Sequence, residues 1–205
     1  QLIARFGSAR DALKELPRLA KRGGGDLRMA NEGEVEREIE KLHALGGRAI
    51  ASCEPDFPSG LAALDPPPPV ISILGNTAIL QRETVAIVGA RNASALGRRL
   101  AATLARDLTA AGLVVASGMA RGIDTAAHEG ALEGGTVAVL AGGVDNIYPP
   151  ENDVLHARII AHGAIVSEMP LGTVPQARHF PRRNRIISGL ARGVIVVEAA
   201  KDPDH

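Results

Sequence analysis

The sequence predicts an α/β protein with a doubly wound, mostly parallel sheet, preceded by part of a small helical domain. The run Thr-Val-Ala-Ile-Val at 84–88 lacks polar alternation, which is typical of a strand buried on both faces of a parallel sheet. Similar short apolar runs recur along the chain, each separated from the next by a helical segment. This alternation predicts right-handed βαβ units with helices on both faces of the sheet. The predicted strands are 84–88, 113–116, 136–140, 164–167 and 194–198.

The first thirty residues predict short helices broken by Pro17 and by the glycines at 23–25. The segment starts abruptly inside a helical pattern, so we interpret 1–30 as a partial helical domain and 31–205 as the core. Asn31 and Glu34 have the spacing of a capping box, which predicts a helix that begins there. Its apolar positions recur at helical spacing until Gly46 and Gly47 end it: Val35, Ile39, Leu42 and Leu45. We interpret the glutamates of this helix as a solvated face. Short strands are predicted at 48–52 and, after the four prolines at 66–69, at 70–74.

The amino-acid composition excludes several kinds of protein and of site. The chain has 205 residues, 45% hydrophobic and 22% charged, with a formal net charge of zero, so no overall field indicates nucleic acid. The charges are nevertheless segregated, with glutamates crowded at 32–40 and arginines at 178–185. Cys53 is the only cysteine, which excludes an internal disulfide and a cysteine-rich metal site. Without a long apolar run or an apolar leader, we expect a cytoplasmic protein.

Loops at the carboxyl ends of the predicted strands carry the unusual residues, at 89–96, 117–122, 141–150 and 168–181. In the first, Gly89 permits close approach of a ligand, and Arg91 adds a planar, charged donor beside the start of the next helix. A phosphate suits this arrangement. The alternative is a plain connection with Arg91 in solvent.

The second loop, Ser-Gly-Met-Ala-Arg-Gly-Ile-Asp at 117–124, is interpreted as another phosphate-type loop. A glycine turn capped by Asp124 would explain its glycines but would leave Arg121 without a role. Asp124 and His128 are four residues apart on one helical face. Because no third ligand follows at a recognisable spacing, we interpret them as an ordinary local pair rather than a metal site.

The third and fourth loops each contain one of the few aromatic residues of the chain, Tyr148 and Phe180. Tyr148 in the third loop is interpreted as a packing residue. In the fourth, arginines at 182, 183 and 185 stand at a helix start, where cations oppose the helix dipole at a cost of a few tenths to ~1 kcal/mol each. Helical spacing places Arg182 and Arg185 along one side while Ile186 and Ile187 face the sheet. An anionic partner would offset that cost, so this segment is the strongest binding signal in the sequence.

Several motifs are absent. The sequence has no G-x-x-x-x-G-K-[ST], and its first glycine loop is not G-x-G-x-x-G, which disfavours ATP hydrolysis of the P-loop kind and nicotinamide cofactors. No cofactor or metal is expected. Phe and Tyr total four, so nucleic-acid affinity should come mainly from backbone phosphates.

Taken together, the loops resemble one family, the DNA-processing protein A family, also called Smf, of bacterial natural transformation. The resemblance covers about residues 48–200. It rests on VGAR at 88–91, SGMARGIDTAAH at 117–128, AVLAGGVDNIYPPEN at 138–152, SEMP at 167–170 and FPRRNRIISGL at 180–190. Residues 1–30 resemble the end of the sterile-alpha-motif-like helical domain that precedes the family's core.

The resemblance implies an extended Rossmann-like core that dimerises and no catalytic activity. It implies a recombination mediator that binds single-stranded DNA and brings the recombinase RecA to incoming DNA. Carried over by position, the residues expected along or beside the DNA groove are Gly89, Arg91, Ser117, Gly118, Arg121, His179, Phe180, Arg182, Arg183, Asn184 and Arg185.

The chain departs from the family pattern at two places. Ala90 stands where serine is common, which matters little if backbone N–H groups bind the ligand. After residue 200 the chain ends in Lys-Asp-Pro-Asp-His, where the family continues with a Ser-Gly-[ST] loop, further strands and often a winged-helix-like domain. We therefore expect a core that is truncated at its C-terminus.

A second function remains open, that of a nucleotide-processing enzyme. Phosphoribohydrolases that activate cytokinins use a related core with glycine loops. Their P-G-G-x-G-T-x-x-E motif supplies a catalytic glutamate, whereas Gly142 and Gly143 here continue as Val-Asp-Asn.

Overall fold

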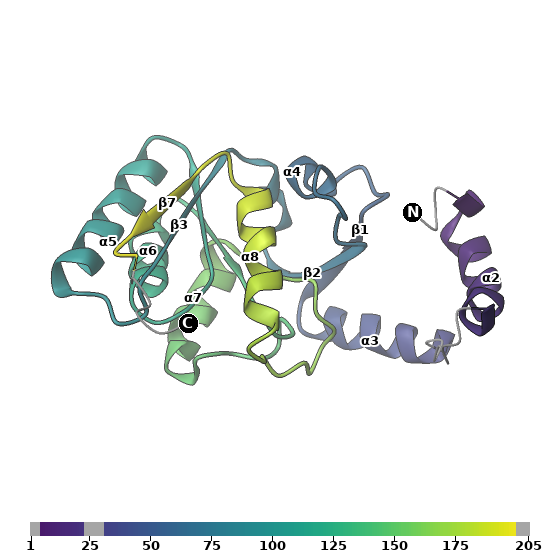
Figure 1. Cartoon of the computed structure of the whole chain (residues 1–205). Coiled ribbons are helices and arrows are strands. Elements are labelled where there is room, and N and C mark those ends of the chain that lie inside the picture. The colour runs from purple at the N-terminus through teal and green to yellow at the C-terminus, as the bar shows by residue number, and fades with distance from the viewer. Residues whose placement is uncertain (1–4, 23–30, 200–205) are drawn as a thin grey trace. The chain divides into compact units, whose positions relative to one another are not determined.

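The computed structural model of the chain describes residues 5–22 and 31–199 (Figure 1). The chain divides into two compact units, Gln1–Arg37 and Glu38–His205. In the described ranges, no helix is both long enough and apolar enough to cross a membrane.

The first unit contains helix α2, Ala9–Arg22. Ser8 caps its start: the Asp11 amide donates to Ser8 Oγ at 3.1 Å, and Ser8 Oγ donates to the Asp11 carboxylate at 2.7 Å. The sequence predicted a break at Pro17, but α2 continues through this residue. Proline removes one N–H donor, and the flanking turns keep the helical conformation around it. The break predicted at 23–25 lies outside the described residues.

Helix α3, Glu32–Ala44, begins at the predicted capping box. The Gly33 amide donates to Asn31 Oδ1 at 2.8 Å, and the Asn31 amide donates to Glu34 Oε2 at 3.4 Å. The glutamate face is not entirely solvated, because Glu38 Oε1 accepts a hydrogen bond from the Leu171 amide at 2.9 Å.

A seven-stranded sheet in the order β1-β2-β6-β5-β4-β3-β7 forms the centre of the second unit. Its strands are β1 Gly47–Ala51, β2 Val70–Gly75, β3 Thr84–Gly89, β4 Val114–Ser117, β5 Thr136–Val139, β6 Ala164–Ser167 and β7 Val194–Val197. The block β6-β5-β4-β3-β7 is parallel, while β1 and β2 join it as an antiparallel pair on β6. All seven predicted strands are present within a residue or two of their predicted bounds, and the doubly wound, mostly parallel sheet is confirmed.

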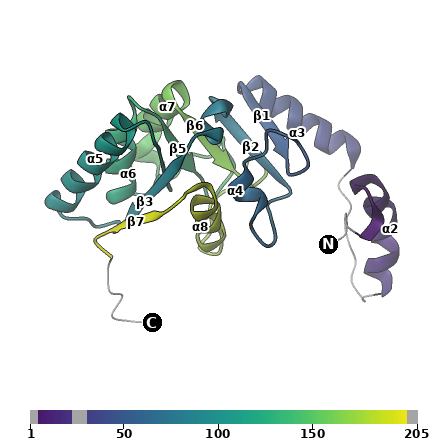
Figure 2. The ribbon, with the colours of Figure 1, turned by 90° about the horizontal axis from the view of Figure 1, so that it is seen from above.

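Helices cover both faces of this sheet (Figure 2). One face carries α5 Ala95–Ala110, α6 Ile123–Ala131 and α7 Asp153–His162, and the other carries α4 Ser59–Ala62 and α8 His179–Leu190. Two 3₁₀ turns complete the described elements, η1 Thr77–Gln81 and η2 Pro150–Asn152.

Strand β3 shows why its sequence lacks polar alternation. Ala86 packs into the cluster with Ile186 and Ile187 of α8, whereas the next residue, Ile87, packs into the cluster with Ile123 of α6. Both residues are fully buried. The strand therefore needs apolar side chains on both faces.

The strand order reverses at β3. From there β4, β5 and β6 extend to one side, and α8 then carries the chain back across the sheet to β7 on the other side. In open α/β sheets, ligands bind outside the carboxyl ends of the strands at such a reversal. The edge formed by the carboxyl ends of β3–β7, called the carboxyl edge below, is therefore the expected place for a site.

Candidate nucleic-acid interface

A cavity of about 180 Å³ lies at the carboxyl edge, and all four loops predicted from the sequence contribute to it. Its lining residues are Arg91, Asn92, Gly118, Ala120, Arg121, Leu140, Ala141, Gly142, Asn146, Tyr148, Pro149, Pro175 and Phe180. We call it the arginine–aromatic cavity. It brings together two cations and two aromatic rings, and none of the described residues that line it is acidic.

The first two loops contact each other through their backbones. Gly122 has a φ of 80°, and a Cβ there would lie 2.3 Å from the Ala90 carbonyl oxygen and 2.6 Å from that of Arg91. The Ile123 amide also donates to the Ala90 carbonyl at 3.2 Å. Only glycine combines this left-handed conformation with so close an approach. The second loop thus supports the backbone that carries Arg91.

Arg91 and Phe180 meet across the arginine–aromatic cavity. The Arg91 guanidinium carbon lies 5.0 Å from the centroid of the Phe180 ring, a cation–π distance. The Phe180 ring also contacts Tyr148 edge to face, with 6.0 Å between centroids. Tyr148 packs against Phe180 but is 50% exposed, so its interpretation as a packing residue stays a prediction. The third loop enters the hydrophobic core at Val144, whereas the Tyr148 ring is exposed and lines the cavity.

Arg183 lies beneath this surface. Its side chain is buried, and it donates to the carbonyl oxygens of Gly118 and, at 2.9 Å, Val139. The guanidinium carbon is 5.9 Å from the centroid of the Phe180 ring. A Cβ on Gly118 would lie 1.8 Å from Arg183 Nη1, so a side chain there would displace the guanidinium. Arg183 therefore ties α8 to the ends of β4 and β5 instead of extending into solvent.

Burial sets the electrostatics of Arg183 and Asp124. Desolvation lowers the pKa of Arg183, while the charge of Asp124 opposes that change and the charge of Arg91 adds to it. Desolvation also raises the pKa of Asp124, against the charge of Arg183 and hydrogen bonds from the Ala120 and Gly118 amides. Asp124 thus holds the second loop in shape and supplies a negative charge to the buried arginine.

Arg182 and Arg185 share one carboxylate. Arg182 Nε donates to Glu168 Oε1 at 2.7 Å, and Arg185 Nη2 donates to Glu168 Oε2. The Glu168 side chain is only 4% exposed. Arg185 also donates to the Pro66 carbonyl at 3.1 Å. The two arginines lie on one side of α8 as predicted, but both are engaged with a buried acid.

The remaining candidates differ in their accessibility. Arg121 is exposed and paired with Glu151, an ion pair whose side chains are 65% and 48% exposed. The hydrogen bond and charge of Glu151 raise the pKa of Arg121. Asn184 is exposed on α8. His179 is buried at the start of α8, where its Nδ1 accepts from the Gln176 amide at 3.3 Å.

Ser117, Gly118 and Gly89 have structural roles in this arrangement. Ser117 is fully buried, and its hydroxyl donates to the Ile87 carbonyl at 2.5 Å, which leaves the side chain unavailable to DNA. A Cβ on Gly89 would lie 1.9 Å from the Val197 carbonyl oxygen. Glycine at 89 is therefore required for the packing of β3 against β7, and the close approach predicted there is made by backbone.

Asp124 and His128 do not form the local pair that the sequence predicted. His128 is fully buried, and its Nδ1 lies 2.8 Å from Thr136 Oγ1. Because Thr136 donates its own hydrogen to the Val115 carbonyl at 2.7 Å, His128 must be the donor and carry its proton on Nδ1. In the described ranges, no three His, Cys, Asp or Glu side chains are grouped so that they could hold a metal ion.

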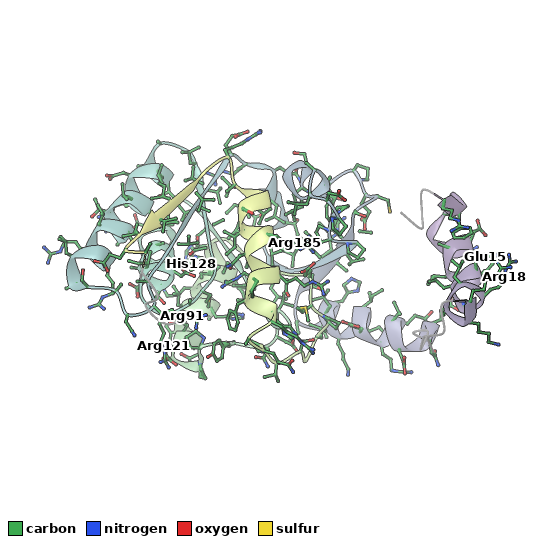
Figure 3. The ribbon with its side chains drawn as sticks, in the orientation of Figure 1. Glu15, Arg18, Arg91, Arg121, His128 and Arg185 are labelled. Atoms are coloured by element: carbon green, nitrogen blue, oxygen red, sulfur yellow. The ribbon has the colours of Figure 1, made fainter. Side chains whose placement is uncertain are left out.

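A second, larger hollow of about 810 Å³ opens on the other side of the first loop. It shares Arg91, Asn92 and Ala120 with the arginine–aromatic cavity and continues along α8 and β7 through Asn184, Ser188 and Val196. Figure 3 shows Arg91 and Arg121 at the same edge of the unit, with Arg185 farther along α8. The loop that carries Arg91 thus has open surface on both sides.

Two residues were missed by sequence reasoning. Glu168 was not predicted to have a role. An acid directly after a strand, in a loop that leads to several arginines, is nevertheless a recognisable signal for an ion pair. Glu151, the partner of Arg121, was likewise not predicted to have a role. A sequence shows the charge of such residues but not which of them lie against each other in space.

Known proteins resemble this chain in sequence and in structure. The sequence profile described as DNA recombination-mediator protein A matches residues 48–203, and that described as the DprA-like N-terminal HHH domain matches residues 1–40. The chain is 43% identical over 154 residues to protein Smf of Synechocystis, covering 71% of the chain and 38% of that protein. It is 39% identical over 179 residues to the DNA processing protein DprA of Bacillus subtilis, covering 82% of the chain and 60% of that protein.

Two solved structures share the fold. The X-ray structure of DprA from Streptococcus pneumoniae matches with a TM-score of 0.77 and 35% identity, over 84% of this chain and 60% of that one. DNA processing protein A from Helicobacter pylori, whose structure concerns its single-stranded DNA binding mode, matches with a TM-score of 0.71 and 31% identity, over 76% and 71%. The chain spans about 60% or less of the length of the two curated relatives described above. With a profile match over most of its length, this chain belongs to the DNA recombination-mediator protein A family, which includes the DprA and Smf proteins.

Proposed function

We propose that this protein binds single-stranded DNA at the carboxyl edge of its sheet and acts as a recombination mediator without catalysing a reaction. The observation that carries the proposal is the arginine–aromatic cavity, in which Arg91 lies over Phe180 with Arg121 and Tyr148 beside them. Cations that follow a phosphate backbone, together with rings on which bases stack, are the features of sequence-tolerant single-strand binding.

The residues of this site are proposed to have different roles, and not all of the arginines contact phosphates. Arg91 and Arg121 are the exposed cations of the cavity, so we assign the phosphate contacts to them. Phe180 and Tyr148 supply the stacking surface. Arg182, Arg183 and Arg185 hold α8 in place through Glu168 and the strand ends. Asn184 faces the larger hollow and is proposed to contact the strand as it leaves the cavity.

Further proposals follow from family membership. We infer that the protein delivers RecA to single-stranded DNA during natural transformation, acts in the cytoplasm and forms a homodimer. RecA-dependent strand exchange on DNA coated with a single-strand-binding protein would test the first point, with and without this chain. Light scattering coupled to size exclusion would test the dimer.

A binding titration tests the central proposal. Fluorescence anisotropy with a labelled single-stranded oligonucleotide, compared with the matching duplex, should show preferential binding of the single strand. The Helicobacter pylori relative serves as the positive control. Equal affinity for both DNA forms, or none for either, would overturn the proposal. Incubation with nucleoside monophosphates, followed by analysis for released base, separates it from a phosphoribohydrolase, which would liberate the base.

A further inference from the structure

The start of helix α5 is the position at which many strand–loop–helix units bind a phosphate. This helix has 16 residues and follows β3 after the loop that carries Arg91. The first N–H groups of a helix have no partner within it, and the helix dipole adds partial positive charge there. Free nucleotides commonly place a phosphate at such a helix start in folds of this class.

In this protein the carboxylate of Glu198, the residue after β7, fills that position. Glu198 Oε2 accepts from the Ser94 amide at 2.8 Å, and Oε1 accepts from the Ser94 hydroxyl. The same hydroxyl, the N-cap of α5, accepts from the Gly97 amide at 3.0 Å. These hydrogen bonds, with a smaller contribution from the charge of Arg98, lower the pKa of Glu198. The group at the helix start is thus an anion that belongs to the protein.

The chain is shaped around this carboxylate at two residues. A Cβ on Gly97 would lie 2.4 Å from Glu198 Cδ and 2.5 and 2.6 Å from its two oxygens. A side chain at position 97 would therefore displace the carboxylate from its present position. Glu198 itself has a φ of 53°, in the left-handed region that residues with a Cβ rarely adopt. Both features place a negative charge where a phosphate would otherwise bind.

We propose that Glu198 is a specificity-determining residue that denies the start of α5 to the phosphate of a free nucleotide. An occupied helix start repels a second anion, so phosphates are left to Arg91 and Arg121 on the cavity side of the same loop. A mononucleotide, abundant in cells, would otherwise compete for the surface beside the DNA site. The inference goes beyond the proposed function because it concerns ligands that the protein rejects.

Removal of the carboxylate tests the proposal. The parent chain, Glu198→Ala and Glu198→Gln are titrated with inorganic phosphate and with dAMP at pH 7.5 and low salt, by calorimetry or by ³¹P line broadening. We expect Glu198→Ala to bind both probes at least about ten-fold more tightly than the parent, because the Ser94 amide and hydroxyl lose their carboxylate partner and can bind an added anion. Glu198→Gln keeps the shape and loses the charge, and should fall between the two.

A second substitution provides the matched control. Adding Gly97→Ala to Glu198→Ala places a methyl group in the vacated space and should return phosphate binding to the level of the parent. Equal binding by the parent and both Glu198 variants overturns the proposal, and so does a gain that persists in the double variant. If circular dichroism shows that Glu198→Ala is unfolded, Glu198→Gln alone decides between these outcomes. Single-stranded DNA binding by the parent is measured separately, so failure of the proposed function would not be confused with failure here.

Discussion

The guanidinium carbon of Arg91 lies 5.0 Å from the centroid of the Phe180 ring. This contact joins the loop after β3 to the first turn of α8, across nearly ninety residues of sequence. Arg183 approaches the same ring at 5.9 Å, so both arginines lie at one edge of the sheet, as the βαβ alternation predicted. The four loops therefore come together beside the Phe180 ring and can form a single surface.

Arg91→Ala should weaken single-stranded DNA binding and make it less dependent on salt. Each phosphate contact contributes about 0.7 to the slope of log affinity against log salt for single strands, so the slope should fall by about that amount. Anisotropy titrations at several salt concentrations measure it. Arg106, exposed on α5 outside the cavity, provides the control, and Arg106→Ala should keep the parent slope. An unchanged slope in Arg91→Ala would remove Arg91 from the DNA site.

Phe180→Ala should lower affinity without changing the salt slope. Loss of one stacked base costs about 1–3 kcal/mol, roughly 5- to 150-fold in affinity. Phe180→Tyr retains the ring and should bind within a few-fold of the parent. The same titrations measure both variants. A change in slope equal to that of Arg91→Ala would show that Phe180 acts by positioning the arginine instead of stacking.

Arg182→Ala should reduce stability more than DNA binding. Arg182 and Arg185 share Glu168, whose side chain is 4% exposed, so loss of one arginine leaves that buried carboxylate less fully paired. We expect a loss of about 1–3 kcal/mol in the free energy of unfolding, measured in urea, with a salt slope close to that of the parent. A slope that falls as in Arg91→Ala would restore Arg182 to the phosphate contacts.

Glu151→Gln should strengthen single-stranded DNA binding. The carboxylate of Glu151 pairs with Arg121 at the surface, where both side chains are largely exposed and the pair can be exchanged for a phosphate. Loss of the competing charge should raise affinity about two- to five-fold at low salt, with less effect at high salt. Glu133→Gln, an exposed acid outside the cavity, is the control. Equal affinities for parent and Glu151→Gln would exclude Arg121 as a phosphate ligand.

Stability should fall as the pH drops below about 6.5, because of His128. Burial, and secondarily the charge of Arg183, lower the pKa of this imidazole from 6.5 to about 3. Between these values the unfolded chain binds a proton that the folded protein excludes, so the free energy of unfolding decreases by up to about 1.4 kcal/mol per pH unit. His156, whose pKa is also lowered by burial, acts in the same direction.

Urea denaturation at pH 7.5 and pH 5 measures this effect. Asn can donate to Thr136 in the manner of Nδ1 and carries no titrating group, so His128→Asn should lose part of the stability difference between the two pH values. At pH 7.5 and 8.5 the imidazole is neutral in both states, and parent and variant should each show little change. The same acid sensitivity in His128→Asn and parent would assign it to other groups.

The sequence predicted the strands well because each is a compact apolar run between turn signals. It also predicted that the loops would share one edge, since parallel strands end together. Side-chain partners could not be predicted in this way. Ser117 points inward because its hydroxyl satisfies the Ile87 carbonyl, and Arg183 is buried because Gly118 and Val139 offer it carbonyl oxygens. Such pairings depend on distances between segments that no local pattern encodes.

The crossover through α8 also has a consequence for how the site forms. Strands β3, β4, β5 and β6 pair with one another in chain order, whereas β7 pairs with β3 through Ile195 and Ile87, a register more distant in sequence than that of β2 on β6. Closing so long a loop slows folding, because the chain loses conformational entropy before the contacts between β3 and β7 can stabilise it. We therefore expect β7 and the α8 segment with Phe180 and Arg183 to dock late, onto a preassembled block. A newly made chain would complete the proposed DNA site in the last step of folding.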